Sequence, residues 1–267
     1  MPVRDDLGKR MKIFYEGIPK TKLMRRTPVM IRIDGKAFHT FTRGFNKPFD
    51  EVLMKAMQET MKYLCKNIQG CVFGYTQSDE ITLVLVDYQT LTTSAWFDYE
   101  VQKLSSIAAS MATMVFNKEF NKAVEEFDKT IEPLRYERKF DDFNKSVDLL
   151  RAYDEALNKG AMFDARCFNV PKEEVTNFVY WRQLDATRNS IQMVGQANFS
   201  HRELQGKSCN QIQDMLHEQK SINWNDFPVA QKRGSACIKQ DGNWVIDLEM
   251  PILKGEDREY VDKLIYI

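Results

Sequence analysis

Two acidic positions in the sequence could carry chemistry, and each lies at the end of a short apolar segment. Asp34 follows the β-type segment 29–33 and is itself followed by Gly35, while Asp79 and Glu80 lie at the turn of a predicted hairpin. If these segments form neighbouring strands, carboxylates from distant positions converge beside a glycine that permits close backbone approach. Two carboxylates and a free carbonyl oxygen suit a hard divalent cation such as Mg²⁺, which also takes water and phosphate ligands.

The elements around these acids are predicted in the order β, α, β, β, α, β. Strand-like segments lie at about 28–34, 70–76, 81–87 and 165–170. Apolar residues at helical spacing predict a helix over about 49–64 and a second one over about 101–115, with N-caps at 92–94. This order is typical of a ferredoxin-like or polymerase-palm sheet, which places the chain in the α/β (α+β) class.

The remaining segments are predicted to elaborate one domain, 1–267. About 118–160 is charged and imperfectly amphipathic, which favours an inserted helical arm or hairpin over a catalytic region. A helix is predicted at about 173–196. The C-terminal extension, about 198–267, contains a predicted hairpin over 235–248 with Asp241 and Gly242 in a type I′ turn.

Composition indicates a globular protein of ordinary character. Lys plus Arg and Asp plus Glu are equal at 38 each, but residues 1–47 contain twelve basic and four acidic residues, a net of +8. This local excess fits a solvated surface or a patch facing polyphosphate or RNA. The five cysteines form no CxxC motif and the three histidines no HExxH motif, so reduced thiols and no zinc site are expected. No membrane span or signal peptide is apparent, and a cytoplasmic location is predicted.

Seven sequence blocks, in order over about 28–250, resemble the tRNA(His) guanylyltransferase family. A series of blocks in one order is far more specific than any single motif. They are Arg32-Ile33-Asp34-Gly35-Lys36-Ala37-Phe38-His39, Asn46-Lys47-Pro48, Phe73-Gly74-Tyr75-Thr76-Gln77-Ser78-Asp79-Glu80, Lys103-Leu104-Ser105-Ser106, Phe163-Asp164-Ala165-Arg166 with Pro171, Tyr180-Trp181-Arg182-Gln183 with Asp185, and Lys232-Arg233-Gly234.

The resemblance implies a palm-like enzyme that adds nucleotides to the 5′ end of tRNA in the 3′-to-5′ direction, with GTP and ATP as substrates. By this likeness, Asp34, the Gly35 carbonyl and Asp79 bind two Mg²⁺ ions, and Glu80 supports catalysis. It further implies a homo-oligomer, with a tetramer expected. The implied nucleotide-binding residues are Asp34, Gly35, Lys36, Ala37, Phe38, His39, Lys47, Ser78 and Asp79. Candidate RNA contacts are Lys103, Arg182, Arg188, Asn189, Lys232 and Arg233, although surface charge is the simpler interpretation of any single one.

One block departs from the family pattern. The eukaryotic enzymes carry His-x-Asn-Asn-Leu-Tyr-Asn after the Trp-Arg segment, whereas this chain has Thr187-Arg188-Asn189-Ser190-Ile191-Gln192-Met193, in which only Asn189 matches. Because the histidine block accompanies the tRNA(His)-specific enzymes, the chain is more similar to the Thg1-like branch, which repairs 5′-truncated tRNAs by templated addition.

Two other classes share parts of this pattern. A palm-fold nucleotide cyclase would also use an acidic pair, but the turn here lacks a Gly-Gly-Asp-Glu-Phe sequence. A non-catalytic ferredoxin-like RNA-binding module would stack bases on strand aromatics, for which Phe73 and Tyr75 are candidates. On the predicted helix at 173–196, Tyr180 and Trp181 are expected to be core or helix-packing aromatics in preference to base-stacking platforms.

Overall fold

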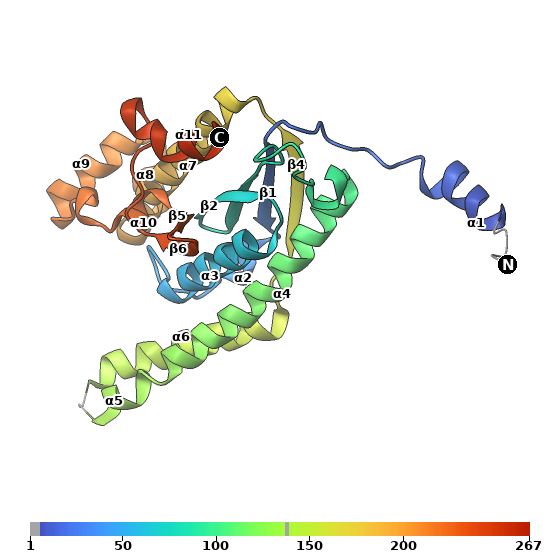
Figure 1. Cartoon of the computed structure of the whole chain (residues 1–267). Coiled ribbons are helices and arrows are strands. Elements are labelled where there is room, and N and C mark those ends of the chain that lie inside the picture. The colour runs from blue at the N-terminus through green and yellow to red at the C-terminus, as the bar shows by residue number, and fades with distance from the viewer. Residues whose placement is uncertain (1–5, 137–138) are drawn as a thin grey trace.

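Six strands form one antiparallel sheet within residues 6–136 and 139–267, which the computed structural model describes (Figure 1). The strand order is β4-β1-β3-β2-β5-β6. The strands are β1 (Val29–Gly35), β2 (Cys71–Gln77), β3 (Glu80–Leu85), β4 (Phe163–Asn169), β5 (Ser235–Gln240) and β6 (Asn243–Asp247).

Two helices connect the first four strands and complete the βαββαβ order. Helix α3 (Glu51–Asn67) joins β1 to β2, and α4 (Val101–Asp128) joins β3 to β4. The predicted ferredoxin-like fold class is therefore confirmed. The β5–β6 hairpin extends the sheet beyond β2, and Asp241 (φ 50°) and Gly242 (φ 80°) form its left-handed turn as the sequence predicted.

The C-terminal helices gather around one long helix on a face of the sheet (Figure 1). Helices α9, α10 and α11 all pack against α7. Between α7 and the sheet lies one of the hydrophobic cores of the molecule. The helices of this part are α7 (Lys172–Asn198), α8 (His201–Leu204), α9 (Cys209–Lys220), α10 (Val229–Arg233) and α11 (Glu259–Ile265).

Side chains of β1 alternate between the two faces of the sheet. Ile31 and Ile33 belong to the core covered by α3 and α4, whereas Met30 belongs to the core beneath α7. With a period of two, Arg32 and Asp34 lie on the same face as Met30. The acidic end of β1 therefore lies on the α7 side of the sheet.

A cluster of phenylalanines fixes the segment that follows β1. The short helix α2 (Phe38–Phe41) inserts Phe38 against Phe116 of α4 and Phe163 of β4, with ring centroids 5.6 and 5.2 Å apart. Phe41 contacts Phe120 one turn further along α4 at 5.4 Å. The loop beside Asp34 is thus held by aromatic packing even though its outer residues are exposed.

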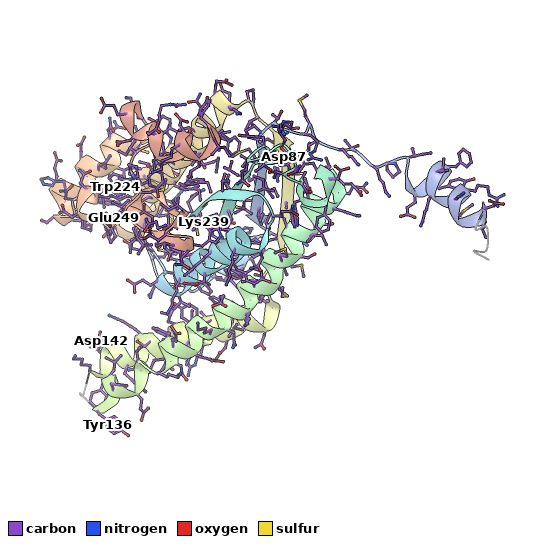
Figure 2. All side chains as sticks on the ribbon, in the orientation of Figure 1. Asp87, Tyr136, Asp142, Trp224, Lys239 and Glu249 are labelled. Atoms are coloured by element: carbon purple, nitrogen blue, oxygen red, sulfur yellow. The ribbon has the colours of Figure 1, made fainter. Side chains whose placement is uncertain are left out.

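A helical arm projects from the sheet (Figure 1). The second half of α4 pairs with α5 (Ile131–Tyr136) and α6 (Phe140–Lys159), and Figure 2 shows Tyr136 and Asp142 at its tip. Because α4 is continuous from Val101, the predicted insertion begins as an extension of a core helix. The predicted N-caps at 92–94 were wrong: α4 begins after a 3₁₀ turn, with Glu100 at its N-cap position.

The N-terminal segment stands away from the sheet (Figure 1). Helix α1 (Asp6–Met11) and the following π-helical turn (Lys12–Glu16) contain no buried residue among those described. A bridge between Lys22 and Glu100 attaches the chain to the body just before β1. In the described part of the chain, no helix is both long enough and apolar enough to cross a membrane.

Asp50 ties three segments together at the start of α3. Its carboxylate caps the helix by accepting hydrogen bonds from the N–H groups of Leu53 (2.9 Å) and Asn46 (3.0 Å). The Tyr153 hydroxyl of α6 donates a third hydrogen bond of 2.7 Å to the same carboxylate. Both residues are buried, so the arm is joined to the core through a charge-assisted hydrogen bond.

We predict that Tyr153→Phe lowers the free energy of unfolding by about 2 kcal/mol, because the buried Asp50 carboxylate loses one of its donors. Urea denaturation would measure the change. Tyr136→Phe is the matched control, since Tyr136 is 78% exposed, and should change stability by less than about 0.5 kcal/mol. Equal stability of the two variants would show that the hydrogen bond to Asp50 contributes nothing.

Candidate active site

Asp34 and Asp79 meet at one end of the sheet. Asp34 lies near the end of β1 and is the cross-strand partner of Glu80, the first residue of β3. Asp79 precedes Glu80 in the β2–β3 turn, and its carbonyl oxygen accepts a 3.0 Å hydrogen bond from the Gly35 N–H. The antiparallel register therefore brings together two acidic residues that are far apart in the sequence.

The surroundings of Asp79 disfavour its negative charge. Burial raises the pKa of the Asp79 carboxyl above its ordinary value, and the carboxylates of Asp34 and Glu80 raise it further. A 3.0 Å hydrogen bond with the Ser78 hydroxyl acts in the opposite direction. Arg32 approaches Asp34 only to 3.9 Å. A divalent cation would relieve the repulsion within this acidic group.

The oxygen donors at this end of the sheet fit Mg²⁺. The carboxylates of Asp34 and Asp79 and the Gly35 carbonyl are hard ligands. Within residues 6–136 and 139–267, no group of three or more His, Cys, Asp or Glu side chains could hold a metal ion. A cation here would therefore complete its shell with water and phosphate oxygens, as Mg²⁺ ordinarily does.

A cleft of about 480 Å³ adjoins the acidic pair. It lies between the loop after β1, the first turn of α3, the β2–β3 turn and Met193 of α7. Seven of the nine predicted nucleotide-binding residues line it, and Asp34 and Lys36 do not. The seven are Gly35, Ala37, Phe38, His39, Lys47, Ser78 and Asp79.

A cationic side chain and an acidic side chain lie at different places in the cleft. Lys47 is exposed on its wall, and Asp79 lies at its acidic end. Phe38 is only 5% exposed and its ring packs in the phenylalanine cluster, so this residue offers the cleft mainly its backbone. A side chain at Gly35 would place its Cβ 2.2 Å from the Phe38 ring, which explains why a glycine is required there. Such a cleft can hold a triphosphate between a cationic side chain and a metal site.

Glu80 does not face the cleft. It is 3% exposed, and its two carboxylate oxygens accept hydrogen bonds of 2.7 and 2.8 Å from Arg182. Arg32 lies 2.7 Å from the same carboxylate. The predicted catalytic role of Glu80 is therefore a supporting one: two guanidinium groups bind its carboxylate, and it positions the strands around Asp34 and Asp79.

The six candidate RNA contacts do not form one surface. Arg182 is 5% exposed and is bound to Glu80 and Asp185, so its assignment as an RNA contact was wrong. Lys103 lies ten residues before Thr113 of α4, whose hydroxyl accepts a hydrogen bond from the Phe163 N–H. With a rise of 1.5 Å per residue, Lys103 is about 15 Å along the helix from the acidic end.

The remaining candidates lie around α7 and α10 and differ in accessibility. Arg188 is 59% exposed and forms an ion pair with Asp185. Asn189 is half-buried and lines a smaller pocket next to the cleft. Lys232 donates to the Asn225 carbonyl, and Arg233 donates to the Met250 carbonyl at 3.2 Å. Only Arg188 therefore presents a largely free surface among these four.

Sequence reasoning missed two residues that shape the site. Arg32 is two positions before Asp34, so the strand period already placed it on the same face and could have identified it as a partner of the acids. Asp50 lines the cleft while capping α3. Its position directly before an apolar helical pattern was an available N-cap signal.

The proposed RNA-binding module is not compatible with this sheet. Phe73 and Tyr75 are 0% and 1% exposed and lie in the core beneath α7, so they cannot stack bases. The Tyr75 hydroxyl also donates a 2.7 Å hydrogen bond to the Arg233 carbonyl. A ferredoxin-like sheet with a carboxylate pair at one end and an adjacent cleft is instead typical of palm-type enzymes that act on nucleotides.

Comparisons with known proteins identify the family to which this chain belongs. The family model described as tRNAHis guanylyltransferase matches residues 8–171, and the chain belongs to this family. A bacterial tRNA(His) guanylyltransferase (Thg1)-like protein in complex with ATP is 43% identical, with a TM-score of 0.81 over 98% of this chain and 100% of that one. A structure of such a protein with GTP is 39% identical, with a TM-score of 0.75 and the same coverage. The tRNA(His) guanylyltransferase of Saccharomyces cerevisiae is 26% identical over 226 residues, which are 79% of this chain and 82% of the yeast protein.

The family assignment confirms two predictions made from the sequence. The chain is a tRNA nucleotidyltransferase, and its resemblance to the guanylyltransferase family is real. The nucleotide cyclase alternative is therefore set aside. The roles of individual site residues stay predictions that the geometry above makes specific.

We predict that Asp79→Asn stabilises the protein in Mg²⁺-free buffer at neutral pH. Folding raises the pKa of this acid, so its protonated form is favoured in the folded state, and that contribution is lost as pH rises through the folded pKa. The advantage of Asn over Asp should thus be small near about pH 4 and grow above it. Thermal unfolding between about pH 4 and 8 would measure it.

Mg²⁺ should reverse this order, because it stabilises the wild-type protein by binding its folded state. Asp148→Asn on α6 is the control, since that side chain is 75% exposed and Mg²⁺ should stabilise this variant as much as the wild type. Equal stabilisation of wild type and Asp79→Asn by Mg²⁺ would remove Asp79 from the metal site.

Proposed function

We propose that this chain adds nucleotides to the 5′ end of tRNA in the 3′-to-5′ direction, with Asp34 and Asp79 holding two Mg²⁺ ions. The observation that carries this proposal is the meeting of Asp34 and Asp79 beside the cleft lined by the loop after β1. Family membership supports tRNA as the second substrate, and the relatives in complex with ATP and GTP support nucleoside triphosphates as the first.

The reaction proceeds in two phosphoryl-transfer steps. First, an oxygen of the tRNA 5′-monophosphate attacks the α-phosphorus of a nucleoside triphosphate, and pyrophosphate leaves. Next, the 3′-hydroxyl of an incoming nucleotide attacks the activated 5′ phosphorus, gives up its proton, and displaces the nucleoside monophosphate. When bound, Mg²⁺ neutralises phosphate charge and favours ionisation of the attacking hydroxyl.

The residues of this chain bind and orient the reactants for both steps. Asp34, Asp79 and the Gly35 carbonyl hold the cations, and Lys47 binds the triphosphate. Gly35, Ala37, Phe38 and His39 of the loop after β1, together with Ser78, line the cleft in which the phosphates lie. Glu80 keeps β1 and β3 in register through its ion pairs with Arg32 and Arg182. The rigid sheet then fixes the distance between the two carboxylates.

Templated repair of 5′-truncated tRNA is the activity that we favour over addition of a single guanosine to tRNA(His). The departure at residues 187–193 supports this choice, and so does the higher identity to the bacterial Thg1-like protein (43%) than to the yeast guanylyltransferase (26%). A tetrameric assembly and a cytoplasmic location stay predictions.

A tRNA that lacks its first nucleotide, incubated with Mg²⁺ and each nucleoside triphosphate in turn, tests the proposal. The wild-type protein should add the nucleotide that pairs with the opposite strand. Asp34→Ala and Asp79→Ala should each lower this rate at least about a hundredfold, because each removes a metal ligand.

Asp148→Ala, on the arm and far from the cleft, is the matched control and should retain full activity. The melting temperature of each variant would verify folding. Transfer that persists in both active-site variants, or that does not depend on Mg²⁺, would contradict the two-metal mechanism. Addition of guanosine alone, whatever the opposite base, would contradict templated repair.

Arg188 and Lys232 are the candidate RNA contacts whose charged side chains we propose to test. Replacement of either with Ala should weaken tRNA binding, and each lost phosphate contact should reduce the slope of log affinity against log salt by about one. Titration of labelled tRNA at several salt concentrations would measure both quantities. Arg151→Ala on α6, whose side chain is 73% exposed, is the control. Unchanged affinity in both test variants would show that RNA binds elsewhere.

A further inference from the structure

Trp181 is exposed to an extent that core packing does not explain. Its side chain lies on α7 and is 50% exposed, whereas the adjacent Arg182 is buried. Leu184 is also 50% exposed, and Arg188 follows one turn later on the same side of the helix. Of the two predicted environments for Trp181, core packing or helix packing, the core is therefore excluded.

Two neighbouring side chains hold the indole ring of Trp181 in place. The guanidinium carbon of Arg182 lies 4.5 Å from the Trp181 ring centroid, a cation–π contact. Arg182 is itself fixed by hydrogen bonds of 2.7 and 2.8 Å to Glu80 and 2.9 Å to Asp185. Phe178 packs against the indole at 5.5 Å with an angle of 71°. Trp181 is thus a flat aromatic surface with little freedom to move.

The same contacts place Trp181 next to the acidic pair but away from the nucleotide cleft. Arg182 links it to Glu80, the cross-strand partner of Asp34. Phe178 links it towards β4, because its ring lies 5.4 Å from Phe168. None of the residues 178–185 is among those lining the cleft, which α7 reaches only at Met193. Two different surfaces therefore approach Asp34 and Asp79.

A basic side chain on β4 adds charge to the second surface. Arg166 is the cross-strand partner of Arg32, and its side chain is 57% exposed. Within the described residues, Arg166 pairs with Asp164 at 3.3 Å, and this ion pair is weak because both side chains are exposed. Arg166 is therefore able to exchange that partner for a phosphate group.

We propose that Trp181 is the platform on which the terminal base at the 5′ end of the RNA substrate stacks, with Arg166 binding an adjacent phosphate. The proposal rests on the proposed function. In-line displacement requires the attacking and leaving groups on opposite sides of the phosphorus, so the RNA end must approach the acidic pair from outside the triphosphate cleft. Stacking tolerates every base, which suits an enzyme that receives RNA ends of differing sequence.

The test uses the full chain and an acceptor-stem RNA hairpin with a 5′-phosphate and 2-aminopurine as its 5′-terminal base. Stacking on Trp181 should quench the 2-aminopurine fluorescence. Trp181→Leu should abolish the quenching and raise the KM for the RNA about tenfold, the effect expected for loss of one base–aromatic stack. The KM for ATP should not change. Trp181→Phe keeps an aromatic ring and should restore most of the quenching.

Phe140→Leu is the matched control, because Phe140 is an aromatic residue on the arm with 58% exposure. Quenching and an RNA KM in Trp181→Leu equal to those of the wild type would overturn the proposal. An equal rise in the KM for ATP would also overturn it, because Trp181 would then act through Arg182 on the whole site.

The outcomes also separate this inference from the proposed function. Quenching by the wild type without nucleotide addition would refute the proposed function and leave the platform. Nucleotide addition that Trp181→Leu does not impair would refute the platform and leave the function. A wild-type protein that neither quenches the probe nor extends the RNA would refute both.

Discussion

Three carboxylates converge at one end of β1 and β3, and their repulsion is the constraint on which the site depends. Glu80 is buried and neutralised by Arg32 and Arg182. Asp34 and Asp79 have no comparably close guanidinium among the described contacts, and burial together with the neighbouring acids raises the pKa of Asp79. The arginines therefore stabilise the strand register while the other two carboxylates stay available for cations. One acid supports the structure, and the other two are the acids that we propose as metal ligands.

The rest of the fold keeps this arrangement rigid and accessible. The phenylalanine cluster anchors the loop after Asp34 to α4, so the cleft has a fixed wall. Asp50 joins that loop to α3 and to the helical arm. On the opposite face, α7 supplies Arg182 to the buried ion pair and leaves Trp181 at the surface. The cleft and the surface around Trp181 thus lie on different sides of the acidic pair.

Much of this architecture followed from sequence periodicity. Strand and helix patterns predicted the βαββαβ order. That order brings Asp34 and Asp79 to one end of the sheet, because the hydrophobic pattern and the turns set the antiparallel register. The burial or exposure of individual charged side chains could not be predicted from the sequence. Arg and Glu are usually surface residues, and only tertiary packing buries Arg182 and Glu80 together. Trp181 is exposed instead. The sequence could not predict this, because an aromatic residue on a helix gives no sign of whether another element covers it.

Anomalous diffraction from crystals grown with Mn²⁺ and a non-hydrolysable nucleoside triphosphate would test the central claim most directly, because Mn²⁺ takes the same oxygen ligands as Mg²⁺. The account predicts metal density bonded to both Asp34 and Asp79 and to the phosphates in the adjoining cleft. Metal bound at Glu80 instead, or a triphosphate seated without contact to either Asp34 or Asp79, would contradict it.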